Sequence, residues 1–243
     1  MKDVFIPTTN YQAFQQLCQD LLQTQLGLEM GCVIGPAGRG KTVAAERVSS
    51  MSASAVYLRY QERFSHVGLI RELAFVLCGA RPGRTQTCFD MIQSELSHRR
   101  RIILVDECDR MSLKHLNTLR DFHDVCRVPV VLIGEEPLKA KLKQERRLES
   151  RVASELRFEP VSPGDVAVFY KMALNQDVAS KQAGILTRHS GGDFRMVVND
   201  ALNIERRMKA SGIAALSDEI IREVCGAENG VNGAARPELR QSA

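Results

Sequence analysis

The pattern of apolar and polar positions divides the chain into two parts. In the first part, short and nearly continuous apolar runs predict buried strands at 30–34, 55–58, 101–106 and 128–134, with a shorter strand at 156–158. Before and between these strands, apolar residues recur every three or four positions, which predicts helices near 10–25, 42–50, 68–77, 88–96 and 112–126. Strands that alternate with helices indicate an α/β fold with a parallel five-stranded sheet flanked by helices.

The pattern changes after Pro160. Ser162, Pro163 and Asp165 are typical of a helix start, with a capping hydroxyl, a proline in the first turn and a carboxylate three residues after the cap. Further helices are expected near 163–174, 178–189, 193–210 and 217–225, with no strand between them. We therefore expect a core over 1–160, a small all-helical C-terminal subdomain over 161–226, and a disordered tail over 227–243 that is poor in apolar residues.

Composition narrows the functional class. The chain has 243 residues, of which 44% are hydrophobic and 26% charged, as in an ordinary soluble globular protein. The formal charge of +4 is compatible with nucleic-acid binding but does not indicate it. None of the seven cysteines forms a CxxC pair, so a zinc ribbon is not expected, and the thiols are expected to be reduced. With no signal peptide or membrane span, we expect a cytoplasmic protein.

The strongest chemical signal follows the first predicted strand and opens the next helix. Its spacing is that of a P-loop, GxxxxGK[ST]. Glycines let the backbone approach phosphate oxygens, and the amides at the helix start donate to them. The expected ATP-binding residues are Gly35, Pro36, Ala37, Gly38, Arg39, Gly40, Lys41, Thr42 and Val43. Lys41 should contact the β- and γ-phosphates, and the Thr42 hydroxyl should ligate Mg²⁺. The alternative is an ordinary glycine-rich turn.

Asp106 and Glu107 end the third predicted strand. At that edge of a parallel sheet Asp106 should lie beside the P-loop and hold Mg²⁺ or its water, and Glu107 should deprotonate the attacking water. An acidic turn without chemistry is the alternative. The two carboxylates favour ATP hydrolysis over phosphoryl transfer to a small molecule.

Three weaker candidates complete this predicted site. Arg195 starts a helix of the second part and could reach the γ-phosphate, or simply be a surface arginine. One of Arg146, Arg147 and Arg151 could reach the nucleotide of a neighbouring subunit, or all three could lie on a solvated basic face. Glu135 follows the fourth strand, where a polar residue would sense the γ-phosphate, although a carboxylate beside phosphate is electrostatically unfavourable.

The order of these motifs resembles that of an AAA+ ATPase from about residue 5 to 225. Within that superfamily the segments at 105–110, 116–121, 130–134 and 149–152 look most like the bacteriophage Mu B protein and the TnsC and TniB transposon regulators. The resemblance implies an ATP-dependent, non-sequence-specific DNA-binding protein of a bacterial host cell. It would form homo-oligomeric filaments or rings on double-stranded DNA and deliver that DNA to a transposase, and hydrolysis would promote disassembly. It also implies that Arg151 is the arginine finger and Arg195 the second sensor.

The chain leaves no room before the P-loop for the DNA-binding appendage of the Mu protein, so DNA contacts are expected from the core. Arg81, Arg84 and Thr85 lie in a predicted loop between two helices and could contact phosphates. Arg99 and Arg100 form a second basic cluster before the third strand, for which a plain basic turn is the alternative.

Other functional classes remain open. A replication-initiator or helicase-loader protein, or a secretion ATPase of the ExeA type, would use the same core, although no helix-turn-helix domain or membrane span is expected here. A small-molecule kinase and a non-catalytic nucleotide switch are the further alternatives.

Overall fold

The computed structural model describes residues 1–24 and 30–227, which form two compact units. The first unit is Thr9–Glu159, and the second combines Met1–Thr8 with the chain from Pro160 onward. The tail expected to be disordered, apart from its first residue, lies outside the described residues, as does position 25 at the end of the first predicted helix.

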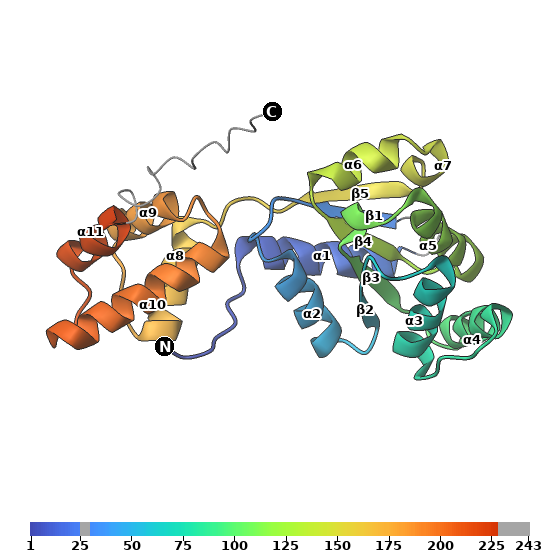
Figure 1. Ribbon diagram of the computed structural model, residues 1–243, viewed down its shortest axis with the longest axis horizontal. Helices are drawn as coiled ribbons and strands as arrows, with labels where there is room; N and C mark the ends of the chain where they lie inside the picture. The colour runs from blue at the N-terminus through green and yellow to red at the C-terminus, as the bar shows by residue number, and fades with distance from the viewer. Residues whose placement is uncertain (25–29, 228–243) are drawn as a thin grey trace, which may run out of the picture. The chain divides into compact units, whose positions relative to one another are not determined.

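The first unit is built on one parallel sheet of five strands (Figure 1). In chain order these are β1 (Met30–Ile34), β2 (Ala55–Arg59), β3 (Ile102–Asp106), β4 (Val130–Gly134) and β5 (Val152–Arg157). Their lateral order is β2-β3-β4-β1-β5, so the strand that precedes the P-loop lies between β4 and β5. The predicted α/β architecture, a parallel five-stranded sheet flanked by helices, is present.

Helices cover both faces of this sheet. The helices of the unit are α1 (Thr9–Gln23), α2 (Lys41–Met51), α3 (His66–Cys78), α4 (Thr85–His98), α5 (Leu113–Cys126), α6 (Glu136–Lys143) and α7 (Arg146–Glu149), with a short 3-10 turn η1 (Cys108–Arg110). The main apolar cluster joins the sheet to α3 through α7. Helices α1 and α2 contact each other and the sheet, with Phe14, Leu21 and Ala45 buried.

The edge strand and the segment before it differ from the sequence-based expectation. Strand β5 begins at Val152, four residues before the predicted strand. Half-buried and exposed positions alternate along it. Such an edge strand lacks the continuous apolar run of a central strand, so only its apolar end was recognised. Helices α6 and α7 were not predicted as elements, since the sequence between β4 and β5 is dominated by charged residues.

The second unit is all-helical, with α8 (Pro163–Leu174), α9 (Ser180–His189), α10 (Phe194–Ser211) and α11 (Asp218–Ala227). The predicted helix start is confirmed: Asp165 N donates to Ser162 Oγ at 3.1 Å, and Ser162 N donates to Asp165 Oδ2 at 3.0 Å. The N-terminal segment packs here, because Ile6 is buried in the apolar cluster of this unit and Lys2 N donates to the carbonyl of Ala173.

Across residues 1–24 and 30–227, no helix has both the length and the apolar character that crossing a bilayer requires.

Candidate functional site

The P-loop lies where the sequence predicted it, between the end of β1 and the start of α2. Gly38 and Gly40 have φ angles of 76° and 90°, in the left-handed region that glycine adopts without a steric penalty. These two glycines turn the chain so that α2 begins at Lys41. The N-terminus of α2, with its amides and its positive dipole end, therefore closes the loop and is suited to bind an anion.

Gly35 is required by a close approach to the edge strand. A Cβ atom at this position would lie 2.8 Å from the carbonyl oxygen of Phe158, and φ is 157°. The amide of Phe158 donates to the carbonyl of Ile34, so the chain after β5 holds the entry to the P-loop. Any larger residue would push the loop away from this support.

The side chain of Lys41 is held over the P-loop by backbone carbonyl groups of the loop. Its Nζ donates to the carbonyl oxygens of Gly35 at 2.6 Å and Pro36 at 2.9 Å. Burial lowers the pKa of Lys41, and the nearby carboxylates, Glu135 first among them, oppose that shift. The ammonium group therefore lies in a partly desolvated position near carboxylates, which suits a lysine that neutralises phosphate charge.

Thr42 and Asp106, the two residues predicted to hold Mg²⁺, are in direct contact. Thr42 Oγ1 donates to Asp106 Oδ2 at 2.7 Å, although the two residues are 64 positions apart. Asp106 is buried at the end of β3. A hydroxyl and a carboxylate are hard oxygen ligands of the type that Mg²⁺ uses together with waters and nucleotide phosphates. These residues fit the site of an ATP-bound Mg²⁺.

Tyr57 belongs to this site although the sequence did not single it out. Its hydroxyl donates to Asp106 Oδ2 at 3.0 Å. Burial, and then the charge of Asp106 and its hydrogen bond, raise the pKa of Tyr57, so the phenol stays a neutral donor. Tyr57 is on β2, which pairs with β3. It therefore fixes one oxygen of Asp106 from the side.

Glu107 has a strained backbone and two arginine partners. Its φ of 62° is in the left-handed region, and its amide donates to Asp106 Oδ1 at 2.9 Å. Its carboxylate oxygens face different guanidinium groups, with Oε1 2.9 Å from Arg59 and Oε2 3.2 Å from Arg110. Strain of this kind clusters at functional sites. Arg59, the last residue of β2, was missed by sequence analysis because only the pairing of β2 with β3 brings it close.

Glu135 follows β4 and precedes α6. Its amide donates to Asp109 Oδ1 at 3.1 Å, and a Cβ atom at the preceding Gly134 would lie 2.7 Å from that same oxygen. The carboxylate of Glu135 is exposed and is near enough to Lys41 to influence its charge. The structure thus places Glu135 toward the P-loop, and its role toward phosphate remains a prediction.

Arg151, the arginine-finger candidate, precedes β5 in the first unit. Its Nε donates to Asp124 Oδ1 at 2.8 Å, and its side chain is 41% exposed. Arg146 and Arg147 are exposed on α7. The assignment of a finger among the three stays a prediction, because the contact it requires would come from a second copy of the chain.

Arg195 is exposed in the first turn of α10, in the helical unit. The side chain of Asp193 caps that helix by accepting from the amide of Arg195 at 2.7 Å. The role of Arg195 as a sensor of the γ-phosphate stays a prediction.

The predicted DNA-binding loop is more ordered than expected. Thr85 is the first residue of α4 rather than part of a loop. Arg81 donates to both carboxylate oxygens of Glu72, at 2.8–3.1 Å, and its guanidinium carbon lies 3.7 Å from the ring centre of Phe75. This pairing neutralises Arg81. Arg84, by contrast, is exposed, and its guanidinium pairs with no carboxylate in the described parts of the chain.

Arg99 and Arg100 lie at the other end of α4. Arg100 donates to the carbonyl of Thr24 at 2.7 Å, whereas Arg99 is exposed and forms no ion pair with any described residue. Since α4 has 14 residues, Arg84 and Arg99 are roughly 20 Å apart at 1.5 Å per residue. They are therefore two separate basic points and not one patch.

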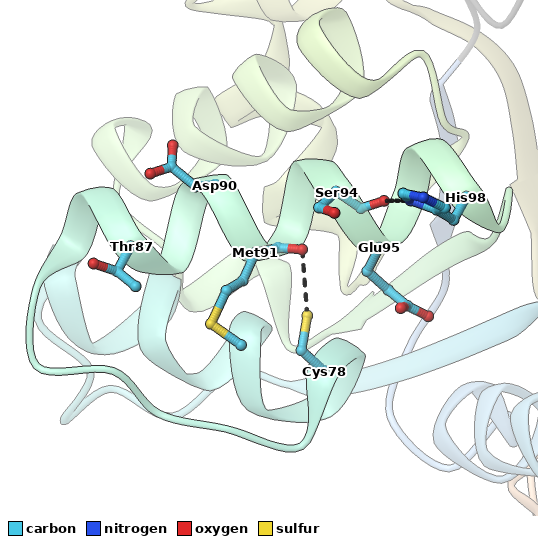
Figure 2. Close-up of a pocket in the computed structure, with 7 residues that line it drawn as sticks. All are labelled: Cys78, Thr87, Asp90, Met91, Ser94, Glu95 and His98. Carbon is cyan, nitrogen blue, oxygen red and sulfur yellow. Dashed lines mark hydrogen bonds between the residues drawn. The ribbon is translucent and has the colours of Figure 1, made fainter.

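A groove of about 420 Å³ runs along α4 beside the end of α3 (Figure 2). Cys78 donates to the carbonyl of Met91 across it, and Asp90 and Glu95 contribute carboxylates. The other lining residues are Thr87, Ser94 and His98. The two carboxylates make this groove unfavourable for a phosphate backbone, so the basic ends of α4 are the positions on this helix where phosphate contacts are predicted.

Comparisons with known proteins agree with this geometry. Residues 26–142 match the family described as AAA domain. A curated relative from Staphylococcus aureus, described as a potential ATP-binding protein, is 25% identical over 129 residues. That match covers 49% of this chain and 48% of the relative, so the chain spans about half the length of the curated relative.

Solved structures show the same fold. The Orc2 protein of Aeropyrum pernix, in its ADPNP–ADP complexes, has a TM-score of 0.66 at 14% identity, covering 96% of this chain and 72% of that one. The Orc1 protein of the same organism, in complex with DNA, has a TM-score of 0.63 at 16% identity, covering 93% and 66%.

Fold, family match and P-loop geometry lead to one conclusion. They support ATP binding and show the P-loop NTPase fold, and residues 26–142 are similar to the family described as AAA domain.

Proposed function

We propose that this protein is an ATP-hydrolysing, DNA-binding AAA+ protein that assembles on duplex DNA and presents it to a transposase. The observation that carries the ATPase part is the contact between Thr42 and Asp106, 2.7 Å apart, with Glu107 as the next residue. The transposition part rests on the sequence resemblance to the Mu B, TnsC and TniB proteins. Without that resemblance, the proposal reduces to an AAA+ ATPase acting on DNA.

Hydrolysis is proposed from the order of the charged groups around Lys41. Lys41 would neutralise the β- and γ-phosphates, and Thr42 with Asp106 would hold Mg²⁺. Glu107 would accept a proton from the attacking water once one of its two arginine partners is displaced. The chain therefore has a residue for each role that phosphoryl transfer to water requires.

The assembly step is proposed to use Arg151. In the described unit this side chain is paired with Asp124 on the surface, a contact of small net strength that a stronger anion can replace. The γ-phosphate of ATP bound to a neighbouring subunit is such an anion. Arg195 is proposed as the second sensor from the sequence resemblance alone.

ATP should control whether the protein coats DNA. In negative-stain images with double-stranded DNA and ATP we expect continuous filaments or rings, and with ADP we expect bare DNA. Arg151→Ala should lose the filaments while retaining ATP binding, because only the subunit contact is affected. Lys143→Ala removes a charge at an exposed position of α6 and serves as the control. Monomers under both nucleotides would rule out the assembly proposal.

DNA affinity should depend on the two ends of α4. Removing both Arg84 and Arg99 by substitution with Ala is expected to make the negative slope of log K for binding against log salt shallower by about 2, since each phosphate contact contributes about −0.9. Arg81→Ala is the matched control and should have a smaller effect, because Glu72 already neutralises Arg81. The measurement is fluorescence anisotropy with duplex DNA at several salt concentrations and two unrelated sequences. An unchanged slope would exclude α4 as the DNA-binding element.

A second candidate function is a replication-initiator or helicase-loader role. The structural likeness to the Orc1 protein in complex with DNA favours it. Stimulation assays separate the two: a target-DNA protein raises strand transfer by its transposase, and a loader raises helicase deposition on DNA. The ATPase and filament experiments do not distinguish them.

A further inference from the structure

The helical unit contains a buried polar cluster that the proposed ATPase function does not use. It combines His189 at the end of α9, Asp200 in the middle of α10 and Cys225 near the end of α11. A ring nitrogen, a carboxylate oxygen and the thiol sulfur of these residues all lie within 4.8 Å of one another. His189 Nδ1 is 3.0 Å from Asp200 Oδ2. Three helices therefore meet at three different potential metal ligands.

The cluster is enclosed. Asp200 is fully buried, Cys225 is 7% exposed, and the side chain of His189 is 11% exposed. Placing a carboxylate in such surroundings is costly unless positive charge or hydrogen bonds compensate it. His189 supplies one partner, and it carries a compensating charge only when it is protonated.

A fourth helix contributes a second, independent observation. Tyr170 of α8 is completely buried, and its hydroxyl has no hydrogen-bond partner among the described residues. Burial, and then the charges of Asp200 and Cys225, raise the pKa of Tyr170, so these two groups are close enough to influence the phenol. A buried hydroxyl without a hydrogen-bond partner is unusual, and a ligand bound at this cluster could supply the missing partner.

We propose that His189, Asp200 and Cys225 bind a divalent transition-metal ion, with Zn²⁺ as the ion of best fit. Imidazole nitrogen, carboxylate oxygen and thiolate sulfur are its usual ligands, whereas Mg²⁺ and Ca²⁺ prefer oxygen alone. Metal–ligand distances of about 2.0–2.3 Å imply roughly 3.3–3.7 Å between ligand atoms in a tetrahedron. The His189–Asp200 pair, 3.0 Å apart, would therefore open slightly, and wider pairs, at most 4.8 Å apart, would move closer together. The fourth position would hold a water that can bond to the Tyr170 hydroxyl.

Binding would exchange protons for the metal. The Cys225 thiol loses its proton to solvent and coordinates as thiolate, and the neutral His189 ring donates a nitrogen lone pair. The ion then compensates the negative charges of Asp200 and Cys225. Because the three ligands come from α9, α10 and α11, the metal would connect three of the helices of this small unit. It would also fix the position of α10, the helix whose first turn contains Arg195.

Cobalt spectroscopy on the untagged, full-length protein tests this site. Titrating metal-free protein with Co²⁺ should give one equivalent of tetrahedral cobalt, with visible d–d bands and a near-ultraviolet thiolate-to-cobalt transition that Zn²⁺ abolishes. Cobalt at the P-loop cation site would give no thiolate band, because that site offers only oxygen ligands. Cys225→Ser should lose the band, and Cys78→Ser, a half-buried cysteine of the other unit, should retain it.

Thermal stability with Zn²⁺ and a second variant, at His189, provide two further tests of the site. Zn²⁺ should raise the unfolding midpoint of the wild-type protein and of C78S, but not that of C225S. His189→Gln should weaken Co²⁺ binding at least tenfold while circular dichroism confirms its helical content, which covers the case in which C225S fails to fold. If Co²⁺ gives no thiolate band with the wild-type protein, or if C225S and C78S bind alike, the cluster is a buried ion pair only.

Discussion

Replacing Glu107 by Gln is expected to slow ATP turnover by about 10²–10⁴-fold, the usual contribution of a positioned general base. ATP affinity should change little, because Lys41, Thr42 and Asp106 remain in place. The amide of Gln preserves the size of the side chain but cannot accept the proton of the attacking water. If hydrolysis promotes disassembly, the mutant should also stay on DNA much longer. Single-turnover hydrolysis and DNA dissociation rates are the measurements.

Two further variants separate catalysis from the ion pairs of Glu107. Glu62→Gln makes the same change at an exposed carboxylate after β2 and should turn over like the wild-type protein. Arg59→Ala removes the 2.9 Å contact to Glu107 but keeps the base, so turnover should persist in it. If E107Q and R59A lose activity equally, Glu107 acts through its arginine contacts and not as a base. An unaltered rate in E107Q would assign the base to another residue.

Replacing Lys41 by Ala should have the largest effect on nucleotide binding. Each hydrogen bond to a charged group contributes about 1.5–3 kcal/mol, which corresponds to about a tenfold to 150-fold loss of ATP affinity. Turnover should fall further, since the lysine also neutralises charge that develops on the γ-phosphate. Isothermal titration with ATP and a steady-state ATPase assay measure the two effects separately.

The specificity of this loss can be tested on the same chain. Lys143→Ala removes one positive charge from an exposed position and should leave ATP affinity unchanged. The folded state of K41A should also be retained, because the bonds it loses are those of Lys41 Nζ to the carbonyls of Gly35 and Pro36 on a partly exposed loop. Normal ATP affinity in K41A would mean that the P-loop is not the nucleotide site.

The P-loop is the part of the site that the sequence predicted most completely. The apolar run of β1, the glycine spacing and the start of α2 are local features, and each predicted its own conformation. The capping box of Ser162 and Asp165 is local as well, and it is present in the structure. Local signals of this kind can be read without the fold, because turn and cap geometry depends on a few neighbouring residues. Strand β5 was only partly predicted, because its position at the edge of the sheet leaves alternate residues exposed and so interrupts the apolar run.

The sequence by itself determined the class of fold. It also predicted the roles of Lys41, Thr42 and Asp106. The tertiary structure decided which other residues stand beside them. Central strands of a parallel sheet are apolar on both faces, so their composition does not encode their lateral order. Only the pairing of β2 with β3, which aligns Arg59 with Asp106, brings Tyr57 and Arg59 to the Asp106–Glu107 pair. Likewise, only helix packing neutralises Arg81 with Glu72 and gathers His189, Asp200 and Cys225 from three helices.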